Sequence, residues 1–144
     1  QGDIRAQYML GTAYQSGRGY EVDLEKAFDW LMKSANGGHL RAMYLVGSAY
    51  ANGLGVEVDL DAAARWYLRA AMAGHEKAQF ALGVFRAKAI GGAKNLIEAA
   101  KWLELAQQAN VENAAKVLDV VKKSMTPEEL SKANQQAMAF KPTS

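Results

Sequence analysis

The sequence contains no cysteine, only two prolines and no long apolar run. The absence of cysteine excludes disulfides, thiolate metal sites and cysteine nucleophiles. No stretch approaches the roughly 18–20 apolar residues that a membrane-spanning helix needs, and no signal peptide is visible. The chain begins at Gln1 rather than at a methionine and enters a repeat almost at once. We therefore expect it to be a fragment of a longer protein.

An excess of charge of one sign is also missing. The 17 basic and 15 acidic residues leave a formal net charge of +2 over 144 residues. So small an excess gives no reason to expect nucleic acid or an anionic membrane as an obligate partner. The length predicts one domain, residues 1–144. Half of the residues are apolar, and the scarcity of proline beside abundant alanine favours helices.

What the sequence does contain is an internal repeat of 36 residues. Shifting the sequence by that period aligns it with itself twice, and a fixed period of this length is typical of stacked helical units. The repeats are predicted at about 3–38, 39–74 and 75–110. Identical residues recur at six matched positions: Ala6, Ala42 and Ala78; Gly11, Gly47 and Gly83; Gly19, Gly55 and Gly91; Leu24, Leu60 and Leu96; Ala27, Ala63 and Ala99; and Trp30, Trp66 and Trp102.

Each repeat has the pattern of two helices joined by a glycine-containing loop. Apolar residues recur at helical spacing in both halves of the first repeat. Asp23 stands where a carboxylate would cap the second helix, and glycines follow each helix. Small residues, Ala6 with Gly11 and Ala27 with Ala35, are predicted to let the two helices of a hairpin approach closely. One hairpin cannot bury its apolar face alone, so the repeats must stack.

Two further helices are predicted after the third repeat, at about 111–124 and 127–140. The second begins at Thr126-Pro127-Glu128-Glu129, which is a capping box with proline at the first helical position. We interpret residues 111–140 as a capping hairpin that closes the array. The whole chain is therefore predicted to be all-α, with about eight helices and no sheet.

The pattern from Ala6 to Gly38, with its Gly-x-Gly loop, Asp-Leu helix start and central tryptophan, resembles a Sel1-like repeat. This family is related to the tetratricopeptide repeats. The resemblance covers about residues 3–110. It implies a right-handed α-solenoid, a superhelix whose first helices line a concave face. It also implies an adaptor that assembles complexes, as in bacterial envelope, virulence-associated and signalling proteins. The compartment stays open between the bacterial periplasm or cell envelope and the cytoplasm.

Residues of the types used in metal sites and catalysis occupy structural positions in the repeat. His39 and His75 follow a glycine and precede a first helix, and Asp23 and Asp59 precede a second helix. A metal site needs three or four converging ligands, which this spacing does not provide. We therefore interpret these four residues as helix caps and the tryptophans as core. The sequence predicts no catalytic residue, no metal and no cofactor.

One stripe of the first helix varies between repeats while the packing positions hold. A binding face of a solenoid can vary in this way because it does not carry the stacking, although a merely solvated face would also vary. Its first position stays basic in all three repeats. We predict that a partner protein or peptide binds this stripe, which comprises Arg5, Met9, Thr12, Arg41, Leu45, Ser48, Lys77 and Val84.

The leading functional hypothesis is a protein-interaction scaffold without enzymatic activity. Two alternatives stay open. One is a small-ligand-binding or hydrolytic protein of the cell-envelope type, which would need a pocket with perturbed titrating groups. The other is a passive structural spacer within a longer protein.

Overall fold

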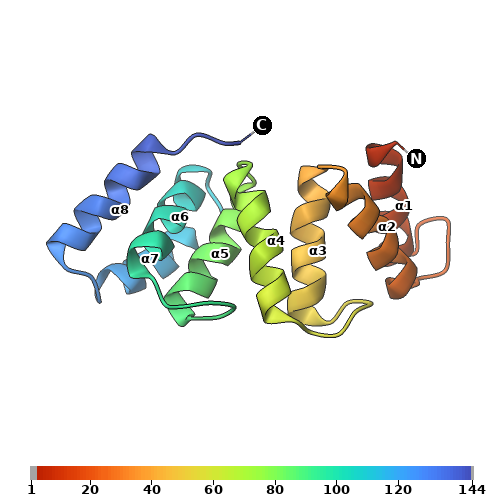
Figure 1. Ribbon diagram of the computed structural model, residues 1–144, viewed down its shortest axis with the longest axis horizontal. Helices are drawn as coiled ribbons and strands as arrows, with labels where there is room; N and C mark the ends of the chain where they lie inside the picture. Colours follow the sequence, from red (N-terminus) through yellow and green to blue (C-terminus); the bar gives the residue numbers. More distant parts are fainter. Residues whose placement is uncertain (1–2, 144) are drawn as a thin grey trace. The chain divides into compact units, whose positions relative to one another are not determined.

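The computed structural model describes residues 3–143, and within that range the chain forms helices and no strand (Figure 1). The all-α prediction is therefore confirmed, and three pairs of 13-residue helices follow the 36-residue period. A shorter helix and a final 13-residue helix come after them. The eight helices are α1 (Ile4–Ser16), α2 (Leu24–Asn36), α3 (Leu40–Asn52), α4 (Leu60–Met72), α5 (Glu76–Lys88), α6 (Leu96–Gln108), α7 (Ala114–Lys122) and α8 (Pro127–Ala139).

Side-chain caps start the helices where the sequence predicts them. The carboxylate of Asp23 accepts a hydrogen bond from the Lys26 backbone N–H at 3.0 Å, and Asp59 caps α4 in the same way. His39 and His75 start the first helices of the second and third repeats, because each Nδ1 accepts a bond from the backbone N–H three residues later, at 3.3 and 3.2 Å. The interpretation of these four residues as caps is confirmed.

Contacts divide the chain into two compact units, residues 1–66 and 67–144, with the division inside α4. In the first unit α1 pairs with α2, and α2 also packs against α3. Gly11 on α1 is buried, and a Cβ there would lie only 2.7 Å from the Leu31 Cγ of α2. The predicted close approach of the two helices at Gly11 is therefore present.

The companion prediction for Ala6 is wrong. Ala6 is exposed, whereas its counterparts Ala42 and Ala78 are fully buried. Five residues separate Ala6 from Gly11, a rotation of about 140° around a helix, so the two cannot face the same neighbour. This position instead lies on the face of the first helix that points away from the second helix of the same repeat.

The loop of the second repeat rests on the start of α2. Gly55 lies in the left-handed region with φ of +79°, and a Cβ there would overlap the Leu24 carbonyl and lie 2.9 Å from the Glu25 backbone nitrogen. Gly19, its counterpart in the first repeat, has a φ of +82° with no atom within 4 Å of a Cβ. The same loop conformation is therefore nested in one repeat and open in the other.

The second unit repeats the hairpin contact and adds the predicted closing helices. A Cβ on Gly83 of α5 would lie 2.8 Å from the Leu103 Cγ of α6. Helices α7 and α8 both pack on α6. Leu103, Leu118 and Ala133 meet in a buried cluster from these three helices.

The boundaries of the closing hairpin differ from prediction at one end. Helix α8 begins at the predicted capping box: the Thr126 N–H donates to the Glu129 carboxylate at 2.9 Å, and the Glu129 N–H donates to the Thr126 hydroxyl at 3.1 Å. Helix α7, however, begins at Ala114 rather than near residue 111. Asn110 and Asn113 adopt positive φ angles of 62° and 68°, and asparagine tolerates such a turn better than most residues.

Candidate functional site

The predicted stripe lies on α1 and α3 in the first unit. Arg5 and Arg41 are exposed, and Met9 is 67% exposed, which is unusual for so large an apolar side chain. Thr12 is half-buried, and its hydroxyl donates to the Met9 carbonyl at 3.0 Å. Leu45 and Ser48 on α3 are half-buried as well. The stripe therefore combines cationic ends with apolar and small polar side chains.

Both arginines of the stripe act on the same side chain, that of His39. The ring of His39 stacks on that of Tyr8, with centroids 4.3 Å apart and an angle of 13° between the planes. Burial lowers the pKa of His39, and the positive charges of Arg41 and then Arg5 lower it further. The neutral ring keeps its Nδ1 lone pair for the cap of α3. Arg5 and Arg41 therefore both place positive charge near the stacked ring of His39.

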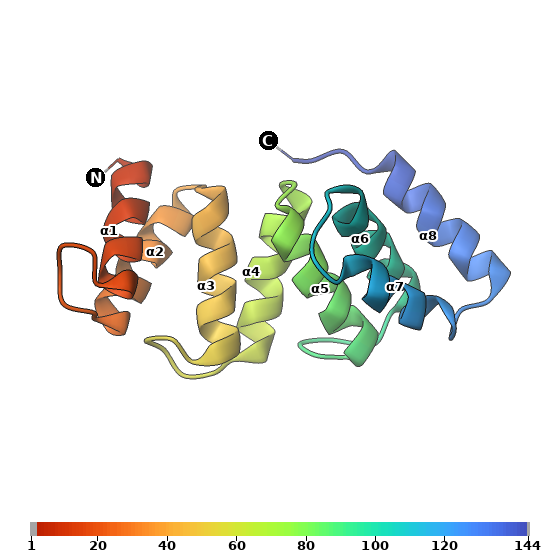
Figure 2. The ribbon, with the colours of Figure 1, turned by 180° about the vertical axis from the view of Figure 1, so that it is seen from behind.

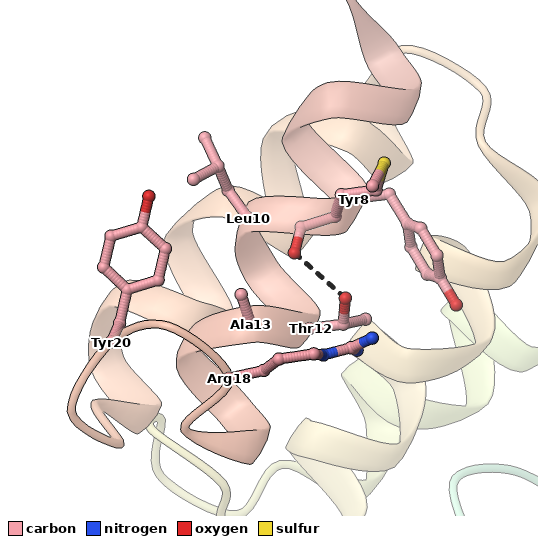
Figure 3. Close-up of a pocket in the computed structure, with 7 residues that line it drawn as sticks. Tyr8, Leu10, Thr12, Ala13, Arg18 and Tyr20 are labelled. Carbon is pink, nitrogen blue, oxygen red and sulfur yellow. Dashed lines mark hydrogen bonds between the residues drawn. The ribbon is translucent and has the colours of Figure 1, made fainter.

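A shallow hollow of about 510 Å³ lies along the exposed side of α1 (Figure 3). Figure 3 shows the Arg18 side chain extending from the loop towards Thr12, with Tyr8 and Tyr20 on opposite sides of the hollow. Two predicted residues line it, and five others were not predicted from the sequence. The seven lining residues are Tyr8, Met9, Leu10, Thr12, Ala13, Arg18 and Tyr20.

Comparison between repeats explains why this face of α1 is hollow. Leu10 is half-buried, but its counterparts Val46 and Leu82 are fully buried. In the first unit, α2 packs against α3, and Phe28 of α2 meets Tyr50 of α3 edge-on with centroids 5.2 Å apart. The hollow therefore corresponds to a surface that a helix covers in the next repeat. The sequence alone does not show this difference, because Leu10 matches the apolar residues Val46 and Leu82 of the other repeats.

The remaining stripe residues lie in the second unit, on α5. Lys77 is exposed, and Ala81 and Val84 are half-buried. The matching helical position is therefore cationic and solvent-facing in this unit too.

Other polar clusters of the second unit hold structure together. Arg86 and Glu98 form an ion pair at 3.1 Å between α5 and α6, and the indole N–H of Trp102 donates to the same Glu98 oxygen at 3.3 Å. Trp102 is only 1% exposed, as a core residue should be, whereas Trp30 and Trp66 are half-buried. The prediction that all three tryptophans are core is therefore confirmed fully only for Trp102.

Across residues 3–143 no three histidine or acidic side chains gather closely enough to hold a metal ion. In the same range no helix has the length and apolar character needed to cross a membrane.

One buried carboxyl has no structural partner to explain it. Glu104 on α6 is 9% exposed, and its Oε2 has no hydrogen-bond partner among the described residues. Burial raises the pKa of Glu104, and the nearby Lys122 opposes that shift. The matching positions of the first two repeats hold Met32 and Leu68, so the carboxyl occupies an apolar site.

We expect Glu104→Met to stabilise the protein by about 1–2 kcal/mol at neutral pH, because it removes a buried ionised group. Because the pKa of Glu104 is raised, the folded state holds this proton more tightly than the unfolded state does. The destabilisation caused by ionised Glu104 is therefore complete above the raised pKa, and it disappears as the pH falls towards the ordinary value of 4.5. Urea unfolding of both proteins between pH 4 and pH 8 measures this. An equal difference at every pH would show that ionisation of Glu104 is not the cause.

A family model described as "Sel1 repeat" matches residues 4–39, 40–75 and 76–110. No curated protein matches the sequence significantly. Among solved structures, a Sel1 repeat protein from Oxalobacter formigenes is 40% identical with a TM-score of 0.75, and the match covers 81% of this chain and 88% of that one.

A second solved structure is longer than this chain. It is a protective antigen present in uropathogenic Escherichia coli strains, with an SLR fold, 29% identity and a TM-score of 0.86. The match covers 97% of this chain but only 30% of the antigen.

Proposed function

Because the chain belongs to the Sel1 repeat family, a helical solenoid of helix-turn-helix repeats, we propose that it serves as a protein-interaction scaffold without catalytic activity. The observation that carries this proposal is the stripe of the first helices, which combines the 67% exposed side chain of Met9 with the exposed cations Arg5 and Arg41. Exposed apolar surface rimmed by polar residues is typical of protein-binding sites.

The partner segment binds the variable stripe of the first helices. In the first unit it contacts Met9 and Thr12 of α1, with Leu45 and Ser48 of α3 and the two arginines. Lys77 and Val84 on α5 supply the corresponding contacts of the second unit. Arginine binds carboxylates through two parallel hydrogen bonds, so acidic residues of the partner would fix its register.

The double variant Arg41→Ala, Leu45→Ala tests the stripe. Partners are first recovered by affinity pull-down with the unmodified chain, and their Kd values for the variant are then measured. We expect a loss of at least 30-fold, because truncating a central interface residue typically costs about 2 kcal/mol or more.

The matched control is Lys116→Ala, Val120→Ala. This pair on α7 has the same spacing and the same chemical types, and both residues are exposed, so it should bind normally. A folded Arg41, Leu45 variant that binds as tightly as the parent would remove this face from consideration. Stabilisation by a small molecule, with no protein partner recovered, would instead favour the ligand-binding alternative.

A further inference from the structure

The segment that follows α8 turns back across the second unit. In both ribbon views the chain leaves the end of α8 and runs past α6 towards the end of α4 (Figures 1 and 2). We call residues 140–143 the return segment. Its path brings it to three separate points of contact in this unit.

The first contact is aromatic. Phe140 meets the ring of Trp102 edge-on, with centroids 5.4 Å apart and an angle of 75° between the planes. The Lys101 ammonium lies 4.3 Å from the centre of the Trp102 ring and 5.8 Å from that of Phe140. Edge-to-face aromatic contacts and cation–π contacts are both favourable, so this point anchors the return segment.

The other two contacts are made to the end of α4. The ring of Pro142 lies against Gly74, where an added Cβ would be 3.3 Å from two of its atoms. The Thr143 backbone N–H donates to the Met72 carbonyl at 2.8 Å, and the Thr143 hydroxyl approaches the same oxygen at 3.3 Å. Met72 is the last residue of α4, so its carbonyl has no donor within the helix. The return segment thus contributes extended backbone as well as two side chains to these contacts.

The repeat does not require this cover. Gly38, the counterpart of Gly74, has a similar φ of +100° against +96° and no atom within 4 Å of a Cβ. Trp30, the counterpart of Trp102, is half-buried under Lys33 at 4.4 Å. Lys141, Pro142 and Thr143 stay exposed, so few contacts hold the return segment. Its release exposes mainly Phe140 and part of the Trp102 ring, which is 1% exposed when covered.

We propose that the surface formed by Met72, Gly74, Lys101 and Trp102, which we call the return site, is a peptide-binding site that the chain fills with its own return segment. The ligand it takes is an extended segment of a partner protein with the pattern aromatic–any–proline–threonine, as in residues 140–143. The return site lies wholly in the second unit and shares no residue with the stripe, so the two proposals stand or fall separately. Partner binding here requires displacement of the return segment.

The probe is a synthetic peptide copying Ala139–Thr143, with both ends blocked. It is titrated into the full chain and into the variant Phe140→Ala, Pro142→Ala, while the indole N–H signal of Trp102 and the amide signal of Gly74 are followed by NMR. A short tether gives the return segment an effective concentration of about millimolar. We therefore expect the peptide to bind the variant at least tenfold more tightly than it binds the full chain.

Further changes keep the test independent of folding damage at Phe140. Thr143→Pro removes both donors to the Met72 carbonyl, the backbone N–H and the hydroxyl, and should also favour peptide binding. Lys101→Ala, added to the double variant, should weaken peptide binding about two- to fivefold, whereas Lys94→Ala, in an exposed loop of the same unit, should not. A peptide with alanine in place of phenylalanine should fail to bind.

Two results would overturn the proposal. Peptide binding to neither protein at millimolar concentration would mean that the return segment only straps the unit together. Equal binding to both proteins would place the peptide outside the return site.

Discussion

Gly55→Ala is expected to destabilise the protein by about 3–5 kcal/mol, enough to remove much of the stability of a typical domain. Two costs add. An L-residue in the left-handed region costs about 1–2 kcal/mol, and the new methyl group would overlap the Leu24 carbonyl and approach the Glu25 nitrogen at 2.9 Å. Because these atoms belong to the backbone at the start of α2, they cannot rotate away. Urea unfolding followed by circular dichroism measures the loss.

Gly19→Ala is the matched control for this change. The backbone φ angles of Gly19 and Gly55 differ by only 3°, +82° against +79°, but a Cβ on Gly19 meets nothing within 4 Å. The control should therefore show the left-handed cost alone, about 1–2 kcal/mol. Similar losses for the two variants would mean that the nesting of the Gly55 loop on α2 does not contribute to stability.

Gly83→Leu is expected to destabilise by about 3 kcal/mol or more, at the upper end of what overpacking costs. Even a methyl group at Gly83 would lie 2.8 Å from the Leu103 Cγ and 3.2 Å from the Ala99 carbonyl oxygen. Leu103 is completely buried, so it has no free space into which to move. The α5–α6 hairpin would have to open. Gly83→Ala should give a smaller loss, so that the cost rises with side-chain size.

The control on the same helix is Ala81→Leu. Ala81 is half-buried on the stripe, and the second repeat carries Leu45 at the same position, so leucine should be tolerated there within about 0.5 kcal/mol. Gly47 is the third glycine of this set and is also buried, and we predict the same sensitivity for Gly47→Leu. A melting temperature unchanged by Gly83→Leu would refute the close-packing role of the position.

The parts of the fold that could be predicted from the sequence depend on short-range chemistry. The Asp23 cap and the Thr126 capping box are satisfied within three residues, so their geometry follows from spacing alone. The repeat period likewise predicts the hairpin, and Gly11 takes its expected place. The prediction for Ala6 is wrong because a residue that is identical in all three repeats need not face the same neighbouring helix as Gly11, which is identical in all three repeats as well.

The candidate site was only partly predictable, for a different reason. Met9 and Thr12 were found because they vary between repeats while the packing positions do not. Leu10 and Ala13 were missed because they match buried residues of the other repeats, and only the arrangement of the helices shows that α1 leaves them uncovered. Glu104 carried a usable signal, a charged residue where Met32 and Leu68 stand. Phe140 carried none, since no repeat position corresponds to the return segment.

The contrast between the Gly55 and Gly19 loops also bears on how such a chain changes through evolution. The loop after α3 packs against the start of α2 at Gly55, so an added residue there would have to be accommodated by the neighbouring hairpin. In the loop after α1, no atom of residues 3–143 lies within 4 Å of a Cβ on Gly19, so no described helix start limits its length, and exposed loops generally tolerate insertions and deletions. Insertions and deletions in chains of this type should therefore collect in loops without a neighbouring helix start, while nested loops keep their length even as their side chains diverge.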